Sequence, residues 1–209
     1  LRNIYNTYFL KDIRDVLGLI DDFKLSKLIK AISLQTGSII SYNELSQISG
    51  YDFLTLKKYL GILEKTFICK IVHPFSRNKR NELKKNPKVY FYDTGLRNYV
   101  LDDFRTTENR TDKGFVYENF IFSQFIKKDL NVKFWRTKSK AEVDFIIEDK
   151  NRLIAIESKS GFQKDTLTRG AYEFIHKYNP EILLFLNTRI ISEKKENKTK
   201  IFSIPHWII

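Results

Sequence analysis

The chain has 209 residues and carries 37 Lys and Arg against 25 Asp and Glu, a formal net charge of +12. Hydrophobic residues make up 42% and aromatic residues 14%, which is enough to fill the cores of one or two domains. A single cysteine, Cys69, excludes a disulfide framework and a thiolate metal cluster. No apolar run approaches the ~18 residues that span a bilayer. We therefore expect a globular protein of the reducing cytoplasm, not inserted in a membrane.

The distribution of charge and histidine indicates which ligands to expect. Residues 1–112 and residues 113–209 each carry an excess of six positive charges. Such a balance favours a polyanion such as DNA, although many basic proteins bind no nucleic acid. His73, His176 and His206 have no Cys or His at ligand spacing, so they are interpreted as structural and zinc is not expected.

The first part of the chain predicts a helical domain. Residues 1–23 have apolar residues at helical spacing and are expected to form a connecting helix. Ser41 and Asp52 have the chemistry of N-caps, and residues 49–51 form the turn between two helices. The helices are expected at residues 24–35, 41–48 and 53–66, and the strands at residues 67–72 and 88–92.

A basic stretch separates the two expected strands. A single acid, Glu82, interrupts it, and we expect an exposed loop. Its cations are Arg77, Lys79, Arg80, Lys84, Lys85 and Lys88. Three helices followed by two strands and such a loop resemble a winged helix over residues 24–101, with residues 102–112 as a linker.

The winged helix has two interpretations. In a DNA-binding version, Thr55, Lys57 and Lys58 of the third helix face the groove or the phosphates, while the basic loop contacts the backbone. In the alternative, the domain docks only against protein, and Lys57 and Lys58 belong to a solvated face.

Residues 113–209 predict an α/β domain. Its expected elements are a helix at 114–128, strands at 142–147 and 153–159, a helix at 166–178, a strand at 182–187, a charged loop at 193–200 and a strand at 201–204. If the first two strands form a hairpin, Glu148 lies opposite Leu153 and Asp144 lies opposite Glu157. Side chains alternate along a strand, so Lys159 joins the same face.

Two carboxylates and one amine are therefore expected to converge, and Glu118 adds a third acid on the apolar stripe of the preceding helix. Carboxylates on a largely apolar surface need a partner. A hard cation such as Mg²⁺ is one answer, because it takes carboxylate oxygens. In the alternative, Lys159 neutralises one carboxylate, Glu118 reaches water or pairs with a cation, and the cluster has no chemistry.

A helix Glu, a strand Asp and Glu-x-Lys on the next strand resemble the PD-(D/E)XK nuclease-like fold, although Val143 replaces the signature proline. The surrounding stretches resemble, more narrowly, the C-terminal region of prokaryotic AAA-type ATPases, across the whole chain. These stretches are Tyr90 to Asn98, Tyr117 to Asn119, Phe134 to Thr137 and Glu142 to Phe145. The resemblance implies an α/β chain, with a small winged-helix domain followed by a restriction-endonuclease-like mixed-sheet domain.

The resemblance also implies a function. Asp144 and Glu157 would hold Mg²⁺ or Mn²⁺, Glu118 would contribute a ligand directly or through water, and Lys159 would act on the water or on the phosphate. ATP would be handled by an upstream ATPase domain, since no Gly-x4-Gly-Lys-Ser/Thr stretch occurs here. The competing hypothesis is a non-catalytic DNA-binding or protein-docking module that regulates the ATPase.

Overall fold

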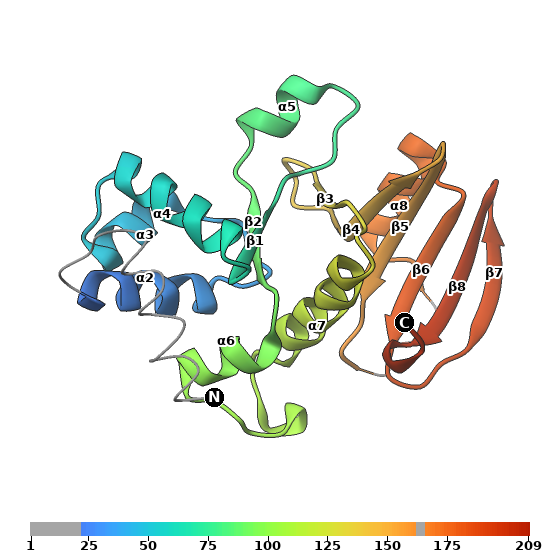
Figure 1. Ribbon diagram of the computed structural model, residues 1–209. Coiled ribbons are helices and arrows are strands. Elements are labelled where there is room, and N and C mark those ends of the chain that lie inside the picture. Colours follow the sequence, from blue (N-terminus) through green and yellow to red (C-terminus); the bar gives the residue numbers. More distant parts are fainter. Residues whose placement is uncertain (1–21, 162–165) are drawn as a thin grey trace. The chain divides into compact units, whose positions relative to one another are not determined.

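The computed structural model describes residues 22–161 and 166–209 (Figure 1). The predicted α/β class is confirmed, because helices come first and a mixed six-stranded sheet follows. Most of the connecting helix expected over residues 1–23 lies outside the described residues. Within the described ranges, no helix is long and apolar enough to cross a membrane.

The described chain forms two compact units. Unit 1 comprises residues 22–71 and 86–110, and unit 2 comprises residues 72–85 and the described residues from 111 onward. The chain thus passes from unit 1 to unit 2 at residue 72 and comes back to unit 1 at residue 86.

Unit 1 begins with the three helices that the sequence predicts, each within two residues of the expected ends. They are α2 (Asp22–Leu34), α3 (Tyr42–Ser49) and α4 (Phe53–Lys65). Ser41 and Asp52 are N-caps as predicted, since the Asp52 carboxylate accepts from the backbone N–H groups of Leu54 and Thr55. Gly50 ends α3 at φ 72°, a conformation that glycine adopts without strain.

The core of unit 1 lies between these helices and a two-stranded sheet of β1 (Cys69–Val72) and β2 (Lys88–Phe91). It includes Leu25, Leu28, Ile29, Leu45, Leu56, Leu60 and Leu63, all buried. Two elements were not predicted, α6 (Thr94–Leu101) and the 3-10 turn Thr107–Asn109. Asp93 caps α6 by accepting from the Leu96 N–H at 2.7 Å.

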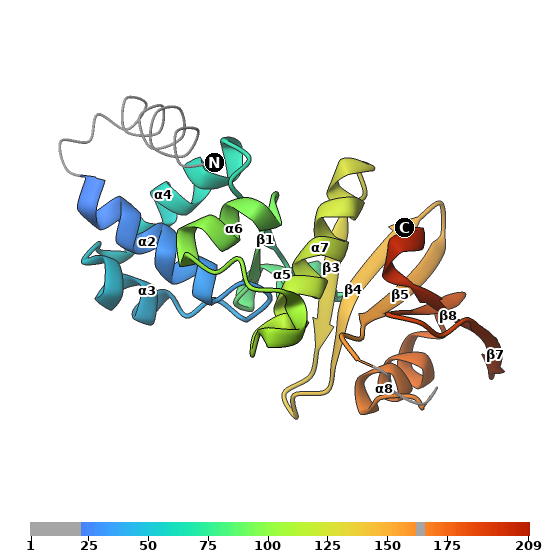
Figure 2. The same ribbon diagram turned by 90° about the horizontal axis from the view of Figure 1, so that it is seen from below.

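Unit 2 is a six-stranded mixed sheet in the order β3-β4-β5-β6-β8-β7. The strands are β3 (Val132–Arg136), β4 (Glu142–Asp149), β5 (Arg152–Ser158), β6 (Ile182–Asn187), β7 (Ser192–Glu196) and β8 (Thr199–Pro205). Strands β3, β4 and β5 are successively antiparallel, whereas β5, β6 and β8 run parallel. Helices α7 (Lys113–Lys127) and α8 (Arg169–Tyr178) cover opposite faces of the sheet (Figure 2).

Two sequence-based assignments in unit 2 were wrong. Residues 193–200, expected as a charged loop, form most of β7 and the start of β8, which pair as Glu196 with Thr199. Charged side chains suit β7 because it is an edge strand, where charge discourages pairing with another chain. The basic stretch expected as a loop contains helix α5 (Lys79–Lys84), capped by the Asn78 side chain. Strand β3 was not predicted.

Residues 72–85 cover the β3 edge of the sheet. Pro74 forms a parallel bridge with Phe134, and the Phe75 N–H donates to the Phe134 carbonyl at 2.5 Å. The Phe75 ring is buried against the rings of Phe174 and Tyr178. This segment is therefore part of the core of unit 2.

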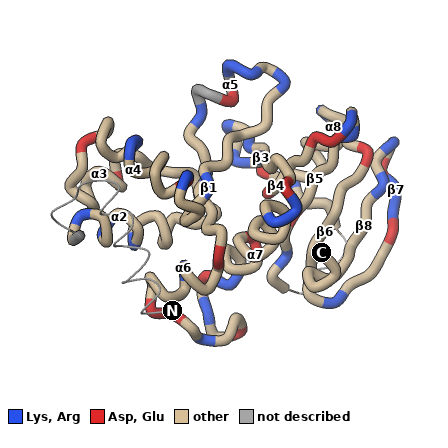
Figure 3. Tube along the Cα trace, viewed as in Figure 1, with Lys and Arg blue, Asp and Glu red and all other residues tan. Residues whose placement is uncertain are grey.

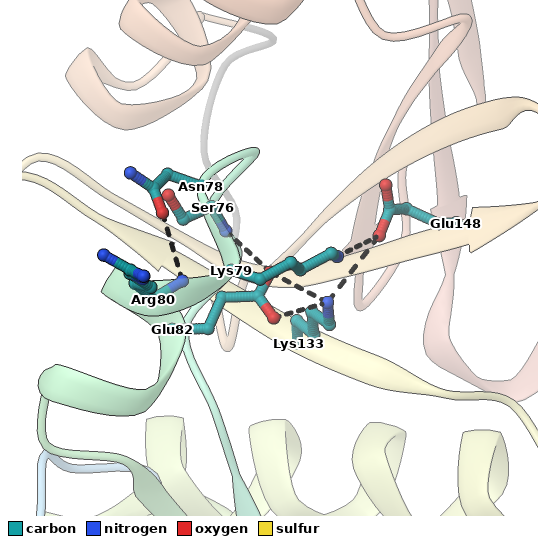
Figure 4. Close-up of polar contacts among 7 residues, drawn as sticks. All are labelled: Ser76, Asn78, Lys79, Arg80, Glu82, Lys133 and Glu148. Carbon is teal, nitrogen blue, oxygen red and sulfur yellow. Dashed lines mark hydrogen bonds and ion pairs between the residues drawn. The ribbon is translucent and has the colours of Figure 1, made fainter.

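A buried carboxylate fixes α5 to the same edge (Figure 4). Glu82 accepts from the Lys133 amine at 2.9 and 3.0 Å and from the Ser76 N–H at 3.1 Å. Lys79 and Lys133 also lie 4.0 and 3.7 Å from Glu148 of β4. Burial disfavours ionisation of Glu82, but these donors hold its pKa below the ordinary value.

We predict that Phe75→Ala lowers the free energy of unfolding of unit 2 by about 3 to 5 kcal/mol, because it empties a packed aromatic site. Denaturant titration with tryptophan fluorescence measures this, since Trp135 and Trp207 both belong to unit 2. Ile191→Ala is the control, because Ile191 belongs to the same unit and its side chain is 72% exposed. Equal unfolding midpoints for the two variants would contradict the role of residues 72–85.

A second prediction concerns His206, whose ring is buried and stacked on Tyr117. Within the described part of the chain, its Nε2 atom has no hydrogen-bond partner. Burial lowers the pKa of His206 to about 4, against a hydrogen bond to the Leu186 backbone that raises it.

The folded pKa of His206 lies below the unfolded value, so the stabilisation is complete above about pH 6.5 and falls as pH drops toward the folded pKa. We expect the chain to lose about 2 kcal/mol between about pH 7 and pH 5 through this group. Chemical denaturation at both pH values should show that His206→Gln removes this loss. The matched variant His176→Gln, at an exposed position, should keep it. The same pH dependence in both variants would contradict this assignment.

Candidate functional site

The β4–β5 hairpin has the register that the sequence predicts, with Glu148 opposite Leu153. The turn is tighter than expected, because the strands extend to the pair Asp149 and Arg152. Lys150 and Asn151 form the turn with φ of 44° and 71°. Such left-handed residues at both central positions match the right-handed twist of a hairpin.

The backbone ladder between β4 and β5 ends at Phe145 and Ile156, one position before the predicted pair of Asp144 and Glu157. Here the Asp144 side chain replaces the missing backbone acceptor: its Oδ2 accepts from the Ser158 N–H at 2.8 Å. Beyond it, the Lys159 N–H donates to the Leu186 carbonyl of β6 at 2.7 Å. Asp144 therefore lies where β5 separates from β4.

Glu157 is 2% exposed and each carboxylate oxygen has a donor. The Lys159 amine lies 2.7 Å from Oε2, and the Thr168 hydroxyl donates to Oε1 at 2.5 Å. Burial raises the pKa of Glu157, Lys159 opposes this shift, and the charge of Asp144 adds to it. The predicted convergence of Asp144, Glu157 and Lys159 is thus present, with Lys159 as the counter-ion.

Glu118 lies on α7 and is 9% exposed. Across residues 22–161 and 166–209, no three His, Cys, Asp or Glu side chains form a group that could hold a metal ion. Glu118, Asp144 and Glu157 are therefore not drawn together into one such group, and the metal-ligand role of Glu118 stays a prediction.

Two carboxylates are nevertheless a donor set that fits Mg²⁺. This ion is usually bound through one or two carboxylates and keeps several waters. Asp144 is half-buried and its Oδ2 accepts a backbone N–H, while the counter-ion of Glu157 is the amine of Lys159. A cation at Asp144 and Glu157 would take over the charge compensation that Lys159 now provides.

The close approach of α8 to β4 positions this cluster. A Cβ atom on Gly170 would lie 1.7 Å from the carbonyl oxygen of Glu142, so only glycine fits here. Thr168 caps the same helix, because its Oγ1 accepts from the Ala171 N–H at 3.0 Å. The start of α8 is therefore held against the strand that carries Asp144.

Thr168 was not identified from the sequence as part of the site. A helix was expected from residue 166, which placed Thr168 inside it, whereas α8 begins at Arg169. A threonine one residue before a helix is a standard N-cap, and that rule would have identified its position. Its contact with Glu157 is tertiary and leaves no sequence signal.

The residues predicted to contact nucleic acid from unit 1 lie on α4. The Thr55 hydroxyl is engaged with the Asp52 carboxylate at 2.6 Å. The Lys57 amine lies over the Phe53 ring, 4.6 Å from its centroid. Lys57 and Lys58 are exposed, so contact with a phosphate is geometrically open to both.

The other residues predicted to contact nucleic acid belong to unit 2 and form a basic strip of Arg77, Lys79, Arg80, Lys84 and Lys85. Figure 3 shows Lys and Arg along the segment around α5. Arg77 lies over the Tyr178 ring at 5.9 Å, and the Lys85 amine lies 3.5 Å from the Arg136 carbonyl. Lys79 takes part in the Glu82 cluster, Arg80 is exposed, and the Lys84 side chain is outside those described. These cations therefore belong to the same unit as Asp144 and Glu157.

We predict that Gly170→Ala destabilises unit 2 by about 3 kcal/mol, because a backbone oxygen cannot move aside as a side chain can. Gly61→Ala is the matched helical control, since open space surrounds that position and alanine favours the helix by up to ~1 kcal/mol. Thermal denaturation compares the two. Equal or higher stability for Gly170→Ala would contradict the tight α8–β4 contact.

Comparison with known proteins gives relatives of undetermined function. An uncharacterized protein of Haemophilus influenzae is 24% identical over 214 aligned positions, covering 100% of this chain and 52% of the relative. Uncharacterized proteins of Mycobacterium bovis and Mycobacterium tuberculosis are each 28% identical over 127 residues, covering 59% of this chain and 29% of the relative. The chain thus spans about half of the first relative and less of the other two.

Two family models match, and they divide the chain near the boundary between the described units. Residues 113–207 match the model described as Domain of unknown function DUF4143. Residues 1–107 match the model described as Domain of unknown function DUF8612, which accounts for more than half of the sequence. The chain therefore belongs to the DUF8612 family, and its residues 113–207 are similar to DUF4143.

Proposed function

We propose that unit 2 is a PD-(D/E)XK nuclease-like domain with a metal-dependent phosphodiesterase site that acts on DNA. The observation that carries this proposal is the meeting of Asp144, Glu157 and Lys159 where β5 leaves β4. A buried acid held by a lysine is costly to keep in a fold, so its presence favours a functional role.

Four side chains divide the work in this proposal. Asp144 and Glu157 hold the cation, with Glu118 contributing directly or through water. When bound, Mg²⁺ or Mn²⁺ supplies polarisation of the phosphate and a lower pKa for a bound water. The Lys159 amine lies 2.7 Å from the Glu157 carboxylate and therefore close to the place of the cation. Its positive charge then stabilises the developing charge on the phosphate.

The parent protein in this proposal is an AAA-type ATPase, with unit 1 as a winged helix between the ATPase and the nuclease-like domain. The share of its relatives that this chain covers leaves room for such a domain. DUF4143 is also typically found in AAA-ATPase-associated proteins. The DNA contacts come from Thr55, Lys57 and Lys58 of unit 1 and from the basic strip of unit 2.

A second candidate is a non-catalytic DNA-binding or docking module of the ATPase. It is favoured by the satisfied state of Glu157, whose two oxygens already have donors in Lys159 and Thr168. In this alternative the cluster is a structural ion pair that holds the start of α8 against β5.

Incubation of the 209-residue chain with linear duplex, single-stranded and branched DNA in Mg²⁺ or Mn²⁺ tests the proposal. We expect cleavage that falls by at least about 100-fold in Asp144→Asn and in Lys159→Ala, because each removes a group that acts in the transition state. Asp149→Asn and Lys150→Ala are the controls, since both residues lie at the turn end of the same hairpin.

Circular dichroism of each variant excludes a loss of folding. No cleavage of any DNA by the unmodified chain, together with DNA binding that weakens as salt rises, would favour the non-catalytic module. Equal cleavage by Asp144→Asn and Asp149→Asn would contradict the assigned site.

A further inference from the structure

Thr168 makes two contacts at once at the junction of α8 and β5. Its Oγ1 accepts from the Ala171 N–H at 3.0 Å, and its hydroxyl proton goes to Glu157 Oε1 at 2.5 Å. A hydroxyl has a single proton and two acceptor positions. The cap bond occupies an acceptor position, so the proton remains available to Glu157.

The two partners of Glu157 differ in what a cation does to them. Lys159 carries a positive charge against Oε2, and a metal ion competes with that charge. Thr168 is neutral and binds Oε1, so its hydrogen bond is compatible with a metal-bound carboxylate. Carboxylates that bind metals are commonly oriented by hydrogen bonds of this kind, and their loss lowers metal affinity by about 10- to 100-fold.

Thr168 is itself held in place. It is the N-cap of α8, with φ −68° and ψ 161°, and Gly170 lets this end of the helix contact β4 closely. The rotation of the buried Glu157 carboxylate is therefore fixed by a residue of α8 rather than by β5 alone.

We infer that Thr168 is a positioning residue that orients Glu157 for a divalent cation, an inference that rests on the proposed function of this site. It predicts that loss of the hydroxyl weakens cation binding even where the helix keeps its start. Three substitutions separate the effect on Glu157 from the effect on the helix start. Thr168→Ser keeps both contacts, whereas Thr168→Val and Thr168→Gly remove both. Glycine at the N-cap costs a helix only a few tenths of a kcal/mol, so Thr168→Gly loses the hydroxyl with little loss of the helix start.

Mn²⁺ alone is the probe, and titration calorimetry on the 209-residue chain gives its dissociation constant without any cleavage assay. We expect Thr168→Ser to bind Mn²⁺ like the unmodified chain, and Thr168→Val and Thr168→Gly each to bind it about 10-fold more weakly. Thermal denaturation should rank Thr168→Gly above Thr168→Val in stability. Affinity and stability would then follow different orders, which a purely structural role does not produce.

Three results would overturn the inference. Equal Mn²⁺ affinity in all four proteins would remove the role of Thr168 and leave the metal site in place. Normal affinity in Thr168→Gly with weak affinity in Thr168→Val would show that only the helix start matters. No Mn²⁺ binding by the unmodified chain would overturn the proposed metal site and, with it, this role.

Discussion

The burial of Glu157 is the constraint on which the C-terminal unit depends. A carboxylate that is 2% exposed cannot stay ionised without compensation, and burial raises its pKa. The compensation comes from Lys159 just beyond β5 and from Thr168 at the start of α8. Both the crossover helix and the end of β5 are therefore tied to one acid, and Asp144 completes the group from the neighbouring strand.

The same unit depends on a segment that lies, in the sequence, between two parts of unit 1. Residues 72–85 depart between β1 and β2 of unit 1, cover the β3 edge of the sheet in unit 2, and supply Phe75 to its core. An uncovered edge strand invites pairing with other chains. The segment closes this edge through Pro74 and Glu82, and the basic residues around α5 are carried with it. The cations that were expected to act as a wing of unit 1 are thus attached to the unit with the candidate site.

Local signals in the sequence predicted much of the fold. The caps Ser41 and Asp52 located two helices, and alternation across the hairpin gave the pairing of Glu148 with Leu153. That register alone places Asp144, Glu157 and Lys159 on one face of the hairpin. Such features were predictable because they depend on neighbours within a few residues or across one turn.

The remaining features depend on distant partners. Strand β7 has so many charges that it resembled a loop, since an edge strand need not alternate apolar and polar residues. The buried carboxylate of Glu82 is compensated by Lys133, which is 51 residues away in the sequence. The contact of Thr168 with Glu157 joins the end of β5 to the start of the helix that follows it. Anomalous diffraction from crystals of this chain grown with Mn²⁺ tests the central claim most directly. We predict a manganese peak at the carboxylates of Asp144 and Glu157, whereas an intact Lys159–Glu157 pair with no peak would contradict the metal site.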